Sequence, residues 1–179
     1  DNTSGSAVSL TNNNLQLWNS NWTFRGSNDL NMGSGAITMT GSRTVTSNGN
    51  GVLTIGGDIS GSGFNLTKAG TGSMIVNSVI GTGAGSLSVT GGTLTLTNGG
   101  NSYTGGTFLT GGTLNINHNT AINTGSLVFT NGGTGSIDNT SGSAVSLTNN
   151  NLQLWNSNWT FRGSNDLNMG SGAITMTGS

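Results

Sequence analysis

The chain has 179 residues, of which 5% are charged, and it contains no cysteine and no proline. This composition excludes disulfides, cysteine-based zinc sites and the basic surface that nucleic-acid binding requires. Apolar residues make up only 31% of the chain, but disordered chains of low hydrophobicity are usually rich in charge and proline. Because threonine favours strands, we expect ordered β-structure, and no apolar run reaches the roughly 18 residues of a membrane-spanning helix.

An internal repeat organises the chain, because residues 138–179 are identical to residues 1–42. The offset is 137 residues, so we expect residues 1–137 to form one full unit and residues 138–179 to begin the next. Identity without a single change indicates a tandem array, of which we expect this sequence to be a piece. One continuous solenoid with no internal domain boundary follows from this pattern.

Short runs of alternating apolar and polar residues follow one another along the chain. They lie at residues 7–10, 15–17, 36–40, 52–55, 73–76, 86–89, 93–97 and 113–117. A period of two places Leu94 and Leu96 on one face of a strand and the neighbouring threonines on the other. No segment keeps a 3.6-residue period over three turns, so the pattern predicts essentially no helix.

Corners rich in glycine or asparagine separate these runs about every 20 residues, as at residues 90–92 and 110–112. A sub-repeat of about 20 residues built from strands and turns is typical of a β-solenoid. Coils of a solenoid stack about 4.8 Å apart, so six or seven coils per unit predict an axial repeat of roughly 30–34 Å. The asparagines at residues 12–14 and 149–151 are expected to form side-chain ladders along the axis.

The candidate contact residues lie in a tryptophan-rich stretch near the start of the unit. Leu15 and Leu17 share one face, which we assign to the core, so strict alternation turns Trp18 outward. Trp155 repeats Trp18 one unit further along. Outward tryptophans at these positions are candidate contacts for glycans or for a neighbouring fibre.

The stretch 18–35 interrupts the regular rhythm of corners and is expected to form a longer coil or a protruding loop. Within it, Trp22 and Phe24 share a face with each other. Because large aromatic side chains are usually buried, we expect both to fill the core of a wide coil.

Several segments of the unit share a family pattern. They read ISGSG (59–63), LTKAGTG (66–72), GTLTLT (92–97), NSYTGGT (101–107) and GGTL (111–114). With these segments, residues 51–130 resemble the autotransporter-associated β-strand repeat, also called the passenger-associated transport repeat. The family-motif residues are Lys68, Gly70, Gly72, Tyr103, Thr104, Gly105, Gly106, Gly111 and Gly112. An extra stretch about one coil long separates the Lys68 half from the Tyr103 half, which is consistent with one inserted coil.

The resemblance implies a right-handed parallel β-helix in a large secreted or surface protein of bacteria. In autotransporters it implies a passenger stalk, but similar arrays occur without the autotransporter barrel, so the secretion route does not carry over. The family pattern brings no catalytic residue and no cofactor.

Residues with catalytic or metal-binding chemistry are sparse. His118 is the only histidine, and without cysteine or glutamate nearby it is expected at the surface rather than in a metal site. Asp1, Asp29 and Asp58 are the only acids of one unit, whereas glycosidases require a carboxylate pair. We therefore expect no enzyme, no metal and no cofactor.

Together these patterns predict a structural segment of a long repetitive extracellular fibre or stalk on a bacterial cell surface. Its expected partner is the chain itself, by end-to-end continuation of coils and by lateral packing, with no nucleic acid and no membrane insertion. One alternative is an autotransporter passenger adhesin that binds a glycan or host ligand. A more remote alternative is an ice-binding solenoid, which requires outward threonine rows such as Thr93, Thr95 and Thr97 on nearly every coil.

Overall fold

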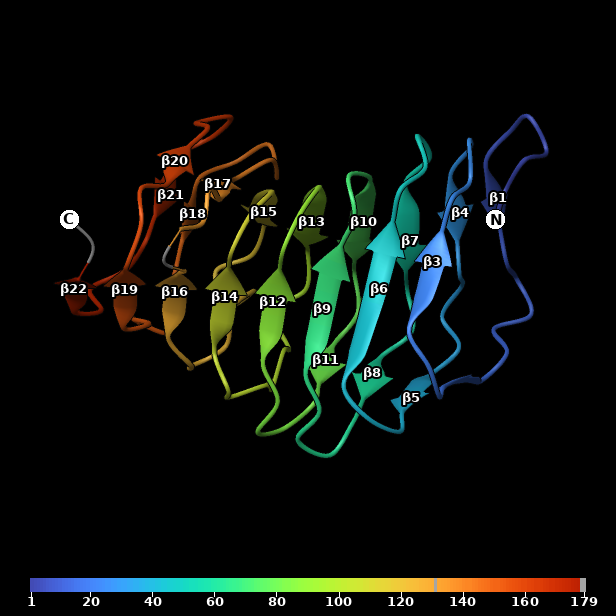
Figure 1. The fold of residues 1–179 in the computed structure, drawn as a ribbon, viewed down its shortest axis with the longest axis horizontal. Helices are drawn as coiled ribbons and strands as arrows, with labels where there is room; N and C mark the ends of the chain where they lie inside the picture. The colour runs from blue at the N-terminus through green and yellow to red at the C-terminus, as the bar shows by residue number, and fades with distance from the viewer. Residues whose placement is uncertain (131, 178–179) are drawn as a thin grey trace.

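The computed structural model describes residues 1–130 and 132–177. These residues form short strands joined by turns, without a helix, and every strand pairing among them is parallel. The strands stack into an elongated rod whose two ends carry the two chain termini (Figure 1). The predicted parallel β-solenoid without helix is therefore confirmed.

Three faces, named A, B and C here, are formed as the chain winds around the rod. Face A is an eight-stranded sheet. Its strands are β1 (Val8–Ser9), β4 (Leu30–Asn31), β7 (Leu53–Ile55), β10 (Ser73–Val76), β13 (Thr93–Leu96), β15 (Thr113–Ile116), β17 (Ser136–Asp138) and β20 (Thr160–Phe161). Face C is a second eight-stranded sheet and lies at the front of Figure 1. Its strands are β3 (Trp22–Phe24), β6 (Arg43–Ser47), β9 (Leu66–Ala69), β12 (Leu87–Val89), β14 (Thr107–Leu109), β16 (Leu127–Phe129), β19 (Gln153–Trp155) and β22 (Ile174–Met176).

Face B lies between A and C in chain order and is interrupted in the middle of the rod. Its strands are β2 (Gln16–Trp18), β5 (Ile37–Met39), β8 (Ile59–Ser60) and β11 (Ile80–Gly81), followed after two coils by β18 (Val145–Ser146) and β21 (Leu167–Asn168). Hydrogen bonds bridge the interruption. They join Ser102 N to Ile80 O, Asn101 Nδ2 to Ala121 O and Thr148 N to Asn119 O. Face B is therefore continuous along the rod, although two of its coils are irregular.

The length of each coil follows from the register of face A. Its inward column runs Val8, Leu30, Leu53, Met74, Leu94, Leu114, Ile137 and Phe161. The shortest coils are those on either side of Leu94, and each matches the spacing that the corners predict. The longest coil runs from Ile137 to Phe161, and the coils near the first end of the rod are of intermediate length.

Alternation along each strand divides core from surface. In β7, Leu53 and Ile55 are fully buried while Thr54 between them is half-exposed. A single coil buries little, but stacked coils cover the apolar side chains of each other from above and below. The core is therefore a thin column of aliphatic residues that runs the length of the rod.

Asparagine and aspartate side chains join consecutive coils, but not as ladders of stacked amides. Asn13 Oδ1 accepts a hydrogen bond from the backbone N–H of Ser34 in the next coil at 2.8 Å, and Asn150 does the same with Ser171 at 2.9 Å. Asp29 likewise accepts from the N–H of Val52 at 2.8 Å. Side-chain to backbone bonds thus replace the predicted side-chain ladders, because turns leave N–H groups that need acceptors.

Candidate functional site

Trp18, the predicted exposed contact residue, points into the core. It is 6% exposed, whereas Leu15 and Leu17 are 85% and 60% exposed, so the predicted orientation of this strand is wrong. The strand alternates, but in the opposite phase. Gln16 can face inward because its Oε1 accepts a hydrogen bond from Trp18 Nε1 at 3.2 Å, and the Trp18 ring packs edge-on against Trp22 at 5.2 Å.

Trp155, the repeated copy of Trp18, also lies on the inner side of its strand and is half-buried. Its ring packs edge-on against Phe129 with centroids 6.4 Å apart, and Trp159 stacks on the same phenyl ring at 4.5 Å and 12°. Phe129, Trp155 and Trp159 form the aromatic cluster. This cluster fills the inside of the rod where the second copy of the sequence rests on the first unit.

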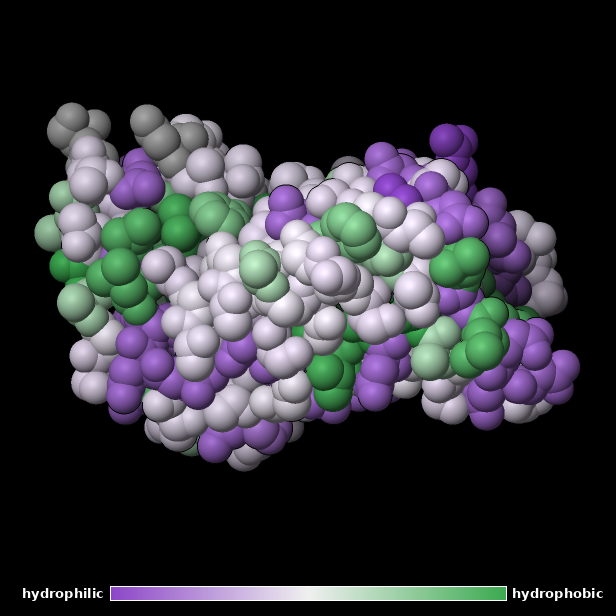
Figure 2. Space-filling model, turned by 90° about the horizontal axis from the view of Figure 1, so that it is seen from below, coloured by the Kyte–Doolittle hydropathy of each residue, from purple (hydrophilic) through white to green (hydrophobic). Residues whose placement is uncertain are grey.

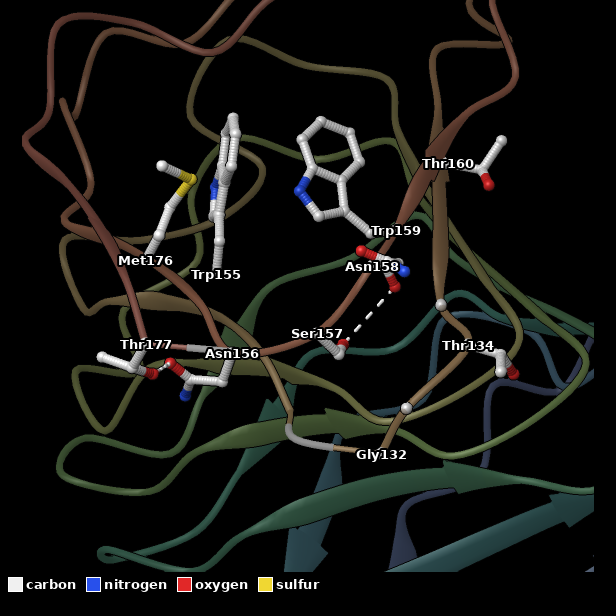
Figure 3. A pocket seen from close by; sticks show the side chains of 12 residues that line it. Gly132, Thr134, Trp155, Asn156, Ser157, Asn158, Trp159, Thr160, Met176 and Thr177 are labelled. Carbon is white, nitrogen blue, oxygen red and sulfur yellow. Dashed lines mark hydrogen bonds between the residues drawn. The ribbon is translucent and has the colours of Figure 1, made fainter. Parts of the chain in front are cut away.

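A cavity of about 1070 Å³ opens beside the aromatic cluster (Figure 3). Trp155 and Trp159 line one side, Met176 and Thr177 lie beside them, and the turn at 132–135 forms the opposite wall. The cavity contains no charged side chain among its lining residues. Its chemistry is therefore that of an aromatic hollow with amide and hydroxyl groups at the rim.

The first copy shows what fills this position. There Val45 of β6 pairs with Trp22, the residue equivalent to Trp159. Arg43 of the same strand donates its Nε to the carbonyl of Trp18 at 2.7 Å. The position beside Trp159 is therefore the one that β6 occupies beside Trp22 in the first copy.

A smaller cavity of about 320 Å³ lies at the other end of the rod, beside Leu10, Asn13 and Gln16. In the second copy the equivalent segment packs against the preceding coil, where Thr148 N–H donates to Asn119 O and Asn149 Nδ2 donates to Ile122 O, each at 3.0 Å. Each cavity thus lies beside a segment that a neighbouring coil covers in the other copy of the repeat.

Lys68, the first family-motif residue, lies within β9 and is fully buried, and its side chain reaches the corner that follows the strand. Its Nζ donates to the carbonyls of Ala69 at 2.9 Å, Gly70 at 3.4 Å and Gly91 at 3.1 Å. Gly91 belongs to the next coil, so the ammonium group ties two corners together. Burial lowers the pKa of Lys68 to about 8, since its acceptors are neutral carbonyls and none is a carboxylate.

Tyr103 fills face B in a coil that has no strand there. It is fully buried, and its hydroxyl shares a hydrogen bond of 2.8 Å with Thr107 Oγ1. Burial raises the pKa of Tyr103 to about 12, against the opposing effect of its hydrogen bonds. The adjacent Thr104 is exposed, and its N–H donates to Gly83 O of the previous coil at 2.7 Å. Both residues hold an irregular coil in register.

The family-motif glycines allow close stacking at corners. Left-handed backbone is adopted by Gly70 (φ +81°), Gly106 (φ +95°) and Gly112 (φ +73°). A Cβ atom on any of the other three, Gly72, Gly105 and Gly111, would lie 2.7–2.8 Å from a carbonyl oxygen of the previous coil. These positions therefore serve the architecture, and none of them presents a reactive group.

Groups with catalytic or metal-binding chemistry lie apart from one another. His118 is exposed, as predicted, and its Nδ1 lies 3.1 Å from Thr120 Oγ1. Asp58 accepts a backbone hydrogen bond from Val79 at 2.9 Å. Within residues 1–130 and 132–177, no cluster of three metal-ligating side chains is found, and no helix of membrane-spanning length and apolarity is present.

The outward threonines do not form a continuous row on face A around Thr95. On face A, Thr95 lies between Ile75 of the coil before it and Asn115 of the coil after it. The regular threonine array that ice binding requires is therefore interrupted on both sides of Thr95.

Phe129 and Arg43 contact the tryptophan-rich coils of the two copies, and no sequence pattern predicts these contacts. The alternation in Leu127-Val128-Phe129 does mark Phe129 as an inward residue. Only the pairing of Phe129 with Trp155, however, reveals that it supports the second copy.

Comparison with protein-family models, with curated proteins and with solved structures gives no match to this chain. The internal repeat supplies a comparison of its own, because residues 1–42 and 138–179 are one sequence in two surroundings.

Proposed function

We propose that this chain is a segment of a long repetitive extracellular bacterial fibre or stalk, in which 137-residue units form one continuous solenoid. One observation carries the proposal: identical residues are covered in one copy and uncovered in the other. Phe24 and Met39 are each 2% exposed, whereas their equivalents Phe161 and Met176 are 43% and 72% exposed. These side chains are core residues, and in the first copy the next coil of the chain covers them.

The distribution of exposed apolar residues supports continuation at both ends. Among the residues that the structure describes, the exposed large apolar side chains lie only near the two ends of the rod. They are Leu10, Leu15, Leu17, Leu152, Phe161, Ile174 and Met176. Figure 2 shows apolar side chains gathered at the end that carries β22, on the left, while the middle of the rod is mostly of intermediate hydropathy. Growth along the axis therefore buries apolar surface that lateral growth leaves exposed.

A mechanical role suits the rest of the surface. One unit carries three aspartates against two arginines and one lysine, so its formal charge is zero and gives no field to steer a charged partner. Backbone hydrogen bonds run parallel to the axis on faces A and C from end to end. The extracellular bacterial setting is supported by the resemblance of residues 51–130 to the autotransporter-associated repeat.

Chains lengthened by one and by two further 137-residue units test the fibre proposal. We expect unbranched rods whose length increases by about 30 Å per unit, measured by small-angle X-ray scattering. Antibodies against the rod should label intact producing cells without permeabilisation. Rods that do not lengthen with unit number, or labelling only after permeabilisation, would contradict the proposal.

The adhesin alternative loses its two candidate contact residues, because Trp18 and Trp155 lie on the inner side of their strands. No feature of the described surface favours a glycan ligand over a structural role. The fibre proposal is therefore the one that the geometry supports best.

A further inference from the structure

The two copies of the repeated sequence lie on different faces of the rod. β2 belongs to face B, but β19, which has the same residues Gln-Leu-Trp, belongs to face C. β5 belongs to face B, and its copy β22 belongs to face C. Figure 1 shows the difference: β19 and β22 continue the front sheet of β6 and β9, whereas β5 lies below with β8 and β11. Each copied strand has moved to the next face.

The register of face A explains this shift. Six coils lead from Val8 to Ile137 in the same inward column. The copy of Val8 is Val145, which lies eight residues beyond Ile137. Eight residues also separate Val8 of face A from Gln16 of face B, which is the step from one face to the next. One repeat therefore contains six coils and one third of another.

The unit turns as a rigid body. In the first copy Val8 pairs with Leu30, and in the second Val145 pairs with Leu167, which is the same register one repeat later. β2 and β5 pair in the register of β19 and β22 in the same way. The strand pairing within each copy is thus the same. The two copies differ only in the face of the rod on which each of their strands lies.

Side chains before and at the start of the second copy hold this turned position. Phe129 on face C supports Trp155, which pairs with it, and stacks with Trp159. Asn151 Nδ2 donates to Gly125 O at 2.6 Å, and Asn149 donates to Ile122 O at 3.0 Å. These contacts join the corner residues of one copy to the last irregular coil of face B, so the turn is specified by the sequence at the junction.

We infer that successive units of the array are related by a threefold screw, each turned by one face relative to the unit before it. This inference rests on the proposed array. Three units contain nineteen coils and span about 91 Å before the same surface returns to the same face. Each unit advances about 30 Å along the axis.

The screw determines how the rod meets a partner. The outward leucine of the repeated strand lies on face B as Leu17 and on face C as Leu154, so the third copy places it on face A. A partner that recognises one unit, including a second rod of this chain, is therefore offered equivalent positions on three sides in turn. A single side repeats its contacts only about every 91 Å.

Paired cysteines test the turned position within this chain, which has no cysteine of its own. Val128 and Leu154 are direct neighbours on the outer side of face C. Neighbouring strands lie about 4.8 Å apart, within the Cα separation that a disulfide accepts. Val128→Cys with Leu154→Cys should therefore oxidise to an intramolecular disulfide. The matched control is Thr120→Cys with Leu154→Cys, in which Thr120 lies on face B, and this pair should stay reduced.

Electron cryo-microscopy of a chain lengthened by two units tests the screw in the array. We expect a one-third turn between successive tryptophan-rich coils, relative to the strand faces of the rod. Rods in which every unit presents the same face, or crosslinking of the Thr120 pair in preference to the Val128 pair, would overturn the inference and leave the fibre proposal standing. Absence of rods would instead overturn the fibre proposal and the screw with it.

Discussion

Phe129 packs the second copy of the repeat against the coil before it. It is 1% exposed, stacks on Trp159 at 4.5 Å and meets Trp155 edge-on. Truncation of a buried phenylalanine costs about 3–5 kcal/mol, and each aromatic pair contributes about 0.5–1.5 kcal/mol beyond burial. We expect Phe129→Ala to cost about 4 kcal/mol. Because solenoid coils contact only their neighbours, the loss should fall on coils around the junction.

Native-state hydrogen exchange measures this cost locally. In a chain lengthened by one unit, in which the coils beyond Phe129 are covered on both sides, amides of residues 136–161 should exchange about 1000-fold faster, since about 1.4 kcal/mol corresponds to a factor of ten. Amides of β7 and β10 should be unchanged.

Phe108→Ala is the matched control for this measurement. Phe108 lies two coils before the second copy on the same face, but it is on the outer side of β14 and is half-exposed. Its truncation should cost about 1 kcal/mol, or roughly a fivefold change in exchange. Acceleration below tenfold in Phe129→Ala, or an equal acceleration along the whole rod, would refute the reasoning.

Four further predictions concern the core and the corners. The pKa of Lys68 is about 8 in the folded chain and ordinarily 10.5. Between these pH values the unfolded chain binds more protons than the folded chain, so thermal stability should rise with pH. Lys68→Met should abolish this rise. The pKa of Tyr103 is raised from 10.0 to about 12, so stability should fall again above pH 10, and Tyr103→Phe should remove that fall in the same thermal scans. Trp18→Ala should lower the free energy of unfolding by about 3–5 kcal/mol in a chain with a preceding unit, whereas Leu17→Ala should lower it by about 0.5 kcal/mol. The reverse order in urea titrations would indicate that Trp18 faces outward. Gly112→Ala should lower the free energy of unfolding by about 1–2 kcal/mol because of its positive φ, and by more because the new Cβ meets the previous coil. Gly83 also has a positive φ but lies in open space, so Gly83→Ala measures the backbone cost alone. Equal losses of stability in the two variants would exclude the packing contribution.

Much of the fold can be predicted from the sequence because its strands alternate clearly. Leu94 and Leu96 share the core face as their spacing indicates, and the turn glycines Gly92 and Gly112 adopt positive φ. The absence of helix and the stacking of short coils follow from the same patterns. These features depend on neighbours in sequence, which a single chain displays.

The orientation of β2 cannot be predicted in this way. A strand of three residues offers two phases, and a change of phase exchanges the inner and outer side chains. Two leucines favour one phase, but Trp18 packs against Trp22, which lies in the next strand along the chain. The wide coil that accommodates both rings is a property of the packed structure, and it decides the phase.

The turn between units is beyond sequence patterns for a different reason. It depends on an excess of eight residues after six coils, which is about one residue per coil. Coil lengths vary by more than this, since the coil from Ile137 to Phe161 is four residues longer than the coil from Met74 to Leu94. Only the strand register, coil by coil, distinguishes a whole number of coils from six and one third.

Three of the asparagine and aspartate side chains at the corners share one direction along the rod, whereas Asn101 accepts from Ile80 N–H of the earlier coil. Asn13, Asp29 and Asp58 all present an oxygen to the backbone N–H of the coil that comes later in the chain. A finished coil therefore offers fixed acceptors toward its C-terminal side, which select the register of the next coil as it arrives. Ordered structure should propagate from the N-terminal end with each coil acting as a template, so a chain that emerges N-terminus first from a narrow exit can fold stepwise as it leaves.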